Sequence, residues 1–315
     1  MALGQYVNVT NLTYAGKEAN EILAKPIYES NLYNMGISYR PGVKGKEKIV
    51  KGDVGDLFQA YSCAFSPNGD VVLSEEFIEP FNIKINLEEC YDKFWGTFLA
   101  EETRIAYAGE GAIPRTFFEW FYQDVLIKEM KKEYEDIFFN GDTTYTGLTR
   151  TYLALGDGVV KKVKAATGAT KFTNGGLTVN NILAKIAEVA ASANSDVDEG
   201  EYKIFMNYGQ VRMLKTALGN EKQVDNLVWS NFTKDGDKIF AYGFEVVPTR
   251  IEKDTILLAP AKNMILGFDL ESDAATFQLL DMSKVNGDNS FRTIALTNMA
   301  VGVVYPELFV LSTRA

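Results

Sequence analysis

YGFEVVPTRIEKDTILLAPAKNMILGF, residues 242–268, contains three short strand-like runs and two prolines. The apolar residues at Val246-Val247, Ile256–Leu258 and Met264–Leu266 are typical of buried β-strands. The stretch holds no histidine and no cysteine. We therefore interpret it as an architectural segment rather than a catalytic one.

The bulk composition is that of a globular, acidic protein. Its 315 residues suggest about two domains, and 46% hydrophobic residues are enough to bury a core. A formal net charge of -10 disfavours dedicated binding of the nucleic-acid phosphate backbone. No apolar run reaches the roughly 18 residues of a membrane span, and the start lacks a signal-peptide pattern. Cys63 and Cys90 match no metal or redox spacing, so we expect reduced thiols.

The chain has no histidine at all. This absence excludes Ser-His-Asp and Cys-His catalysis and imidazole zinc sites, and it makes an enzyme less expected. The acidic run Asp196, Asp198, Glu199 and Glu201 does not fit a calcium loop, because the glycine and the twelfth residue are misplaced. We expect no catalytic, cofactor-binding or metal-ligating residue.

Adjacent glutamates leave one enzymatic alternative open. Glu75-Glu76, Glu88-Glu89 and Glu101-Glu102 could supply the two carboxyl groups of a hydrolase if a pair faced another across a cleft. We interpret all three pairs as polar faces of their elements. The basic residues between Lys161 and Lys171 are likewise interpreted as a solvated surface.

Residues 36–85 predict an extended loop that contains a β-hairpin. Asn68-Gly69 is a strong two-residue turn signal, flanked by alternating apolar residues from Tyr61 to Phe65 and at Val71 and Leu73. The preceding glycine- and lysine-rich part predicts exposed, extended chain. Because a long hairpin is marginally stable alone in water, it must pack on its own domain or on another subunit.

The remaining segments predict an α+β protein. A helix is expected from Asn86 to about residue 109, and a longer one over about residues 114–139, ending at Asn140-Gly141. Thr178 is expected to cap a further helix, and Asn207 to cap another after the strand YKIFM. Residues 142–262 then predict a compact α/β unit, and residues 263–315 predict strands that return to a sheet on the long helix.

Three segments in this order resemble the major capsid proteins of tailed bacteriophages, which have the Hong Kong 97-like fold. IPRTFFEWFYQDVLIKEMKKEYEDIFFNGDTTYTGL is similar to the family's spine helix and its exit turn. YKIFMNYGQVRMLKTAL is similar to the strand and helix of its axial domain, and residues 242–282 to the stretch that leaves that domain.

The resemblance implies a domain organisation for the whole chain. The implied parts are an N-terminal arm over residues 1–35, an extended loop over 36–85, a peripheral domain over 86–141 with the spine helix at about 114–139, an axial domain over 142–262, and peripheral return strands over 263–315.

The resemblance also implies a function. It implies a non-enzymatic shell subunit that forms hexamers and pentamers of an icosahedral capsid around double-stranded DNA, without cofactors and without specific DNA binding. The implied location is the virion, after assembly in the cytoplasm of a host bacterium. Portal, decoration and scaffolding proteins are possible further partners, and with an arm of about 35 residues any scaffold is expected to be a separate protein.

In the family the extended loop lies over a neighbouring subunit, which makes its residues candidates for contacts between subunits. These candidates are Lys44, Lys46, Lys48, Lys51, Asn68 and Gly69. Two alternatives stay open at this point. One is an encapsulin-like nanocompartment shell, which shares the fold, and the other is the carboxylate-dependent hydrolase.

Overall fold

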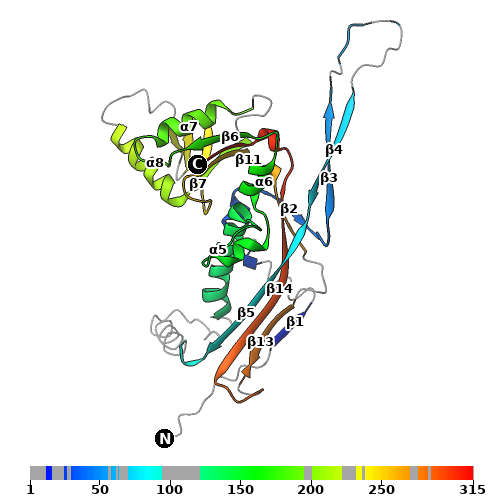
Figure 1. Ribbon diagram of the computed structural model, residues 1–315, viewed down its shortest axis with the longest axis vertical. Helices are drawn as coiled ribbons and strands as arrows, with labels where there is room; N and C mark the ends of the chain where they lie inside the picture. Colours follow the sequence, from blue (N-terminus) through cyan, green and yellow to red (C-terminus); the bar gives the residue numbers. More distant parts are fainter. Residues whose placement is uncertain are drawn as a thin grey trace.

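The structure is a computed structural model of the chain. It describes residues 12–15, 25–26, 30–55, 58–61, 63, 70–93, 121–194, 201–221, 232–235, 238–269, 276–282 and 285–314. The described strands form a six-stranded sheet, a seven-stranded sheet and a two-stranded hairpin (Figure 1), so the expected α+β class is confirmed. No helix in this part of the chain is long and apolar enough to cross a membrane.

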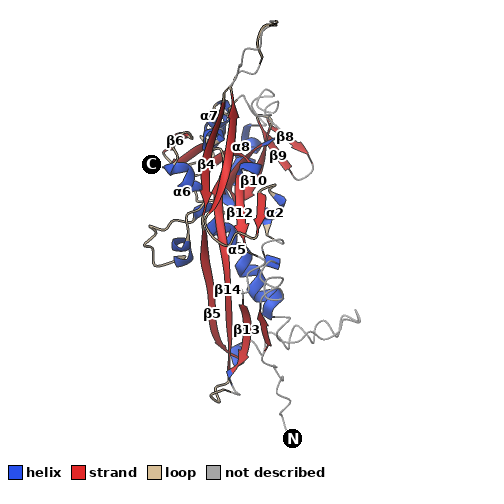
Figure 2. Cartoon of the chain, turned by 90° about the vertical axis from the view of Figure 1, so that its right-hand side faces the viewer, coloured by secondary structure: helices blue, strands red, loops and turns tan. Residues whose placement is uncertain are grey.

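The six-stranded sheet is organised by its longest strand, β14 (Ser290–Val303). One side of β14 pairs with β5 (Pro80–Cys90) along the whole of that strand, and Figure 2 shows the two running side by side. The other side pairs with two shorter strands, each of which has a further neighbour. These strands are β13 (Thr276–Asp281) with β1 (Leu12–Ala15), and β12 (Met264–Phe268) with β2 (Ser38–Pro41).

Strand β5 corrects the helix predicted from Asn86. Residues 86–90 continue the strand, and Leu87 lies opposite Thr293 of β14. The apolar residues Ile83, Ile85 and Leu87 alternate with polar ones and turn toward the core, which is the period of a strand half covered by other elements. The rest of that predicted helix, from residue 94 on, lies outside the described residues.

The long helix is confirmed over the part that the structure describes. A π-helical turn, η1 (Phe121–Leu126), leads into α5 (Ile127–Asn140). Its buried face includes Met130, Tyr134 and Phe138, which pack against the six-stranded sheet. The helix ends at Asn140, where Gly141 lies so close to Gly158 that a side chain at either position would clash with backbone. The predicted start near residue 114 lies outside the described residues.

The seven-stranded sheet carries two helices on one face. Strand β7 (Tyr202–Asn207) leads into α8 (Tyr208–Glu221), and the Asn207 side chain accepts a hydrogen bond from the Gly209 N–H, as predicted for a cap. The other helix, α7 (Ile182–Ala191), begins after Asn181 and not directly after Thr178. The remaining strands are β10 (Phe244–Thr249), β9 (Lys238–Ala241), β8 (Phe232–Asp235), β11 (Ile256–Pro260), β15 (Val310–Arg314) and β6 (Thr170–Asn174).

Strand β15 corrects the expectation that all of residues 263–315 return to one sheet. It lies between β11 and β6 in the seven-stranded sheet, with Leu311 opposite Leu257. Val310 and Leu311 point to opposite faces of that sheet and are both buried, so each fills a different core cluster. Burial on both faces stabilises β15 in this position.

One hydrophobic cluster joins the two large sheets. It contains Phe205 and Leu257 of the seven-stranded sheet, Phe277 and Phe291 of the six-stranded sheet, and Phe139 of α5 between them. The rings of Phe139 and Phe205 are 5.9 Å apart between centroids. A second cluster lies under α7 and α8. The two sheets therefore share a continuous core along α5.

Candidate functional site

The hairpin projects away from both large sheets. It consists of β3 (Glu47–Val54) and β4 (Val71–Ile78), which pair antiparallel (Figure 1). The lysine-rich segment expected to be unpaired loop is thus a strand, and Tyr61 and Cys63, expected in a strand, lie beyond it. The backbone N–H and C=O groups of β3 form hydrogen bonds with those of β4. The local sequence pattern of β3 does not indicate this pairing. Asn68 and Gly69 lie outside the described residues.

One side of this hairpin carries four exposed apolar side chains beside the Lys48–Glu75 ion pair; we call it the outer face and define it by Val50, Val71, Leu73 and Phe77. These side chains are 56%, 60%, 66% and 48% exposed, respectively. The register places them together, because Gly52 lies opposite Leu73 and directly opposed residues share one side of a sheet. Four exposed apolar side chains on one narrow strand pair are unusual in a protein that acts alone.

The opposite side of the hairpin packs on its own molecule at the base. Ile78 is buried against Val43, Ile265 and Ala300, with Ile49 at the edge of this small cluster. The hairpin is therefore anchored on one side at its base, while the outer face has no such cover among the described residues.

The four candidate lysines behave differently from one another. Lys48 pairs with Glu75, and the Lys51 Nζ lies 3.1 Å from Glu76 Oε1 and 5.4 Å from the centre of the Tyr305 ring. Lys46 lies over the Phe77 ring at 4.6 Å, and Lys44 is exposed. Three of them thus have contacts within their own chain that hold the register of the hairpin. Their pairing with a neighbouring subunit stays a prediction.

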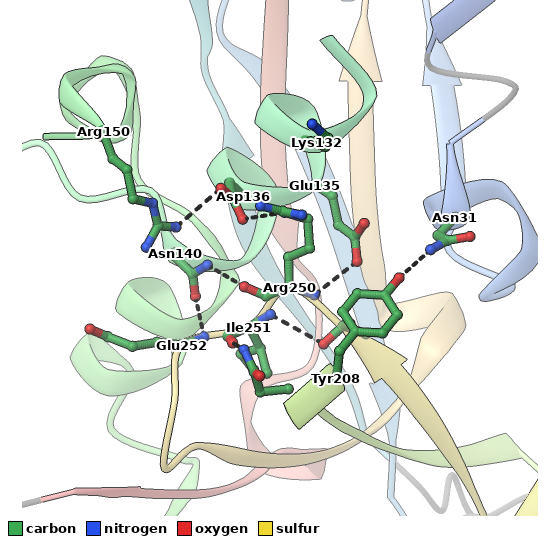
Figure 3. A network of polar contacts seen from close by, with 12 residues as sticks. Asn31, Lys132, Glu135, Asp136, Asn140, Arg150, Tyr208, Arg250, Ile251 and Glu252 are labelled. Atoms are coloured by element: carbon green, nitrogen blue, oxygen red, sulfur yellow. Dashed lines mark hydrogen bonds and ion pairs between the residues drawn. The ribbon is translucent and has the colours of Figure 1, made fainter. Parts of the chain in front are cut away.

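A polar clamp joins the end of α5 to the segment between β10 and β11; we define it by Glu135, Asp136, Asn140 and residues 250–252 (Figure 3). Glu135 Oε1 accepts a hydrogen bond from the Arg250 N–H at 2.9 Å. Asn140 donates to the Arg250 carbonyl oxygen at 2.8 Å and accepts from the Glu252 N–H at 2.7 Å. Side chains of α5 therefore provide hydrogen-bond partners for backbone N–H and C=O groups of this irregular segment.

Asp136 is the charged centre of the clamp. Its carboxylate lies 2.9 Å from Arg250 Nε and 3.2 Å from an Arg150 guanidinium nitrogen, and it accepts a hydrogen bond from the Tyr152 hydroxyl at 2.8 Å. The side chain of Asp136 is buried, whereas both arginines reach solvent. A buried carboxylate with two guanidinium partners fixes their positions relative to α5.

Glu135 has a different environment although it is the neighbouring residue. Burial raises the pKa of its carboxyl group to about 7, against the opposing effects of the Arg250 N–H and the Arg250 charge. The group borders a pocket of about 350 Å³. The pocket is lined by Ser30, Asn31, Lys128, Lys131, Lys132, Glu135, Tyr208 and Arg250.

The described residues contain no group of three or more histidine, cysteine or acidic side chains that could hold a metal ion. The four described carboxylates that were considered for a hydrolase are each paired with a basic side chain. Glu75 and Glu76 pair with Lys48 and Lys51 on the hairpin, Glu88 pairs with Arg292, and Glu89 pairs with Lys93. Glu101, Glu102 and the acidic run from Asp196 to Glu199 lie outside the described residues. Cys63 and Cys90 are exposed free thiols.

No family model and no curated protein matches the chain, but solved structures do. A chain from the procapsid of satellite phage P4 that includes the size determination protein gives a TM-score of 0.66 at 13% identity, covering 97% of this chain and 93% of that chain. A chain from the capsid of the phage XM1, of the Myoviridae, gives 0.51 at 11% identity, with 99% and 96% covered. The chain has the Hong Kong 97-like fold of phage major capsid proteins.

A third solved capsid structure is similar to this chain in fold. A chain from the capsid of an empty GTA particle gives a TM-score of 0.52 at 14% identity, and the match covers 91% of this chain and 90% of that chain. Because these matches span nearly the whole chain, the resemblance seen in three sequence segments is confirmed as a likeness of fold.

The clamp is the part of the site that sequence reasoning missed. The sequence feature that could have revealed the clamp is the presence of Glu135, Asp136 and Asn140 near the C-terminal end of the long helix. They lie beside aromatic residues in a stretch that is expected to be buried. Buried polar residues need partners, so their positions predict contacts to a second element. The partner segment at Arg250 carries no comparable signal.

Proposed function

We propose that this chain is a structural subunit of an icosahedral shell, which assembles through hexamers and pentamers and encloses double-stranded DNA. The observation that carries the proposal is the outer face of the hairpin on a capsid fold. A second copy of the chain can cover this face, and repeated head-to-tail contacts of this kind generate closed rings. Portal, scaffolding and decoration proteins are proposed as further partners, and the virion as its location.

The energetics favour many weak contacts over one strong one. Burying an apolar side chain that is about half exposed contributes roughly 1 kcal/mol, so the outer face contributes a few kcal/mol per contact before the cost of association. Such a contact is weak in a pair of subunits. In a ring each subunit has two neighbours, and closure makes the assembly far more stable than a single pair.

The charge of the chain supports a container for DNA. A net charge of -10 opposes strong adhesion to the phosphate backbone, so packaged DNA would be held without being bound along the wall.

The purified chain tests the proposal directly. Negative-stain imaging and light scattering should show rings or shells for the unaltered protein. Leu73→Asp places a charge on the outer face and should lower the assembled fraction while the thermal midpoint of unfolding stays unchanged, because Leu73 is exposed in the free subunit. Val285→Asp changes an equally exposed apolar residue in a distant turn and is the matched control.

Two results would contradict the proposal. A monomer at every salt and protein concentration removes the shell function. Native particles that hold an enzyme in place of nuclease-protected double-stranded DNA support the encapsulin-like alternative instead.

A further inference from the structure

The pocket beside Glu135 gathers basic side chains in a chain that is acidic overall. It has a volume of about 350 Å³, and four of its eight described lining residues are basic while one is acidic. Three of the basic residues lie on α5 at spacings of three and four positions, which places them on one face of the helix; they are Lys128, Lys131 and Lys132. The fourth is Arg250, from the segment after β10. The pocket therefore offers an anion a positive lining that the net charge of -10 does not suggest.

The lysines on this helix face stand close enough to repel one another. Like charges three or four positions apart destabilise a helix. Lys132 Nζ lies 2.7 Å from Glu129 Oε2, but the side chains of that pair are 50% and 61% exposed, and exposed pairs of this kind contribute little. An anion in the pocket would relieve the repulsion among all three ammonium groups at once.

The floor of the pocket provides a carboxyl group. Glu135 is only 4% exposed, whereas Lys128 and Lys132 are exposed, so the carboxyl group lies deep and the ammonium groups lie at the mouth. Its Oε1 accepts the hydrogen bond from the Arg250 N–H, and Oε2 has no hydrogen-bond partner among the described residues. Because burial raises the pKa of Glu135 to about 7, a large share of the molecules carry a carboxyl O–H here at neutral pH.

Tyr208 adds a second hydroxyl at the same depth. The Tyr208 oxygen accepts a hydrogen bond from the Asn31 side-chain amide, so its own O–H is left to donate. Burial and the nearby charge of Glu135 raise the pKa of Tyr208, which keeps this hydroxyl protonated. Figure 3 shows the three side chains together, although they come from α5, from α8 and from α2 (Asn31–Asn34). The other charged groups that act on Glu135 are Arg250 and Asp136.

We propose that this pocket binds a small anion that carries two or more phosphate groups, such as pyrophosphate or a nucleoside triphosphate. The lysine ammonium groups neutralise the charge at the mouth, while the Glu135 carboxyl and the Tyr208 hydroxyl donate hydrogen bonds to a phosphate oxygen at the floor. Phosphate suits this arrangement because each group combines multiple negative charge with several strong acceptor oxygens. The inference is independent of the proposed shell function, since all the lining residues belong to one chain.

The first test is calorimetric titration of the full chain with pyrophosphate, in whatever state of assembly the chain adopts. We expect one saturable site per chain and a thermal midpoint that rises with pyrophosphate concentration. The double variant Lys128→Gln with Lys131→Gln should bind at least tenfold more weakly, because it loses two charge-assisted hydrogen bonds. The control removes the same charge at Lys185→Gln with Lys215→Gln, on helices α7 and α8 and outside the pocket lining, and should bind normally. The absence of saturable binding, or equal affinity of the two double variants, overturns the inference.

The second test locates the phosphate at the floor of the pocket. At pH 8 most of the unaltered protein has an ionised Glu135, which repels the anion, so Glu135→Gln should bind pyrophosphate up to about tenfold more tightly at this pH. Tyr208→Phe, which lacks the hydroxyl donor, should bind severalfold more weakly with its fold intact. Glu135→Gln binding that is equal to or weaker than that of the unaltered protein at pH 8 overturns the inference.

A comparison of two ligands identifies what the pocket recognises. Equal affinity for pyrophosphate and adenosine triphosphate supports recognition of the phosphate groups alone, and tighter binding of the nucleotide supports further contacts to the nucleoside. Binding of neither ligand overturns the inference and leaves the shell function standing, because assembly is measured separately by imaging.

Discussion

Glu135 and Asp136 show how two neighbouring carboxyl groups acquire opposite roles. Asp136 has two guanidinium partners and anchors both of them to α5. Glu135 accepts a hydrogen bond from one backbone N–H and is buried. Its burial favours the neutral form of the carboxyl group and raises its pKa to about 7. The difference arises from the position of Arg250, whose side chain turns to Asp136 while its backbone faces Glu135.

The raised pKa of Glu135 predicts a pH dependence of stability. Its folded-state pKa lies above the ordinary glutamate value of 4.5, so the folded protein binds more protons than the unfolded chain between pH 4.5 and about 7. The free energy of unfolding must then fall as pH rises through this range, by roughly 3 kcal/mol for this group. Glu135→Gln keeps the oxygen that accepts the Arg250 N–H and removes this loss.

The measurement compares thermal midpoints at pH 5 and pH 8. Glu135→Gln should match the unaltered protein at pH 5 and exceed it at pH 8. The control is Glu129→Gln on the same helix, whose carboxylate is mostly exposed and pairs with Lys132. A midpoint for Glu135→Gln that stays below that of the unaltered protein at pH 8 would contradict the proposed cost of ionisation.

The hairpin is seated on its own subunit by the packing of Ile78 at its base. Ile78 is buried beside Gly302 of β14, where a β-carbon would lie 2.8 Å from the Ile78 side chain and 3.3 Å from that of Ile265. The absence of a side chain at Gly302 therefore creates the space in which the hairpin is seated. This space lies on the far side of the strand pair from the outer face.

A substitution at this glycine should loosen the whole element. Gly302→Ala forces Ile78 or Ile265 to move and should destabilise the protein by about 1–3 kcal/mol, measured by denaturant unfolding. Gly219→Ala is the matched control, because Gly219 lies in α8 with no atom near its absent side chain. The control should stabilise the protein by about 0.5–1 kcal/mol. Equal effects at both positions would show that Ile78 is not held by this contact.

The sequence predicted those helices and strands whose formation depends on a local residue pattern. Strand β7 and the Asn207 cap follow from an apolar run and a capping residue, and both are confirmed. The strand at residues 86–90 was missed, although the alternation of Ile83, Ile85 and Leu87 indicates it, because glutamate-rich sequence also favours helix. Strand β3 was missed because its stability comes from pairing with β4 and not from its own composition.

At the scale of the whole molecule, the shared core couples the two large sheets. The cluster around Phe138 and Phe139 contains side chains from both sheets, and the clamp adds polar contacts at the same junction. The sequence gives no sign of this, because β15 and β11 are separated by the strands of the other sheet along the chain. Their adjacency is a property of topology and not of local pattern.

A shared core predicts a single unfolding transition. Phe139 of α5 is fully buried and its ring packs against that of Phe205, so Phe139→Ala should destabilise the protein by about 3–5 kcal/mol and shift the whole transition together. Calorimetry of the free subunit should show one peak for both proteins, at a lower temperature for the variant. Two peaks, of which only one moves, would mean that the sheets unfold independently. Leu155→Ala, at a partly exposed residue, is the control and should leave the midpoint nearly unchanged.

The connection between β4 and β5 has a mechanical consequence. A single residue, Glu79, separates the two strands, and β5 then pairs with β14 over eleven residue positions. Tension applied to the hairpin along the strand direction is passed into β5 and is shared among the hydrogen bonds of the β5–β14 ladder. The projecting element is thus a tether whose mechanical strength depends on the β5–β14 ladder inside its own subunit.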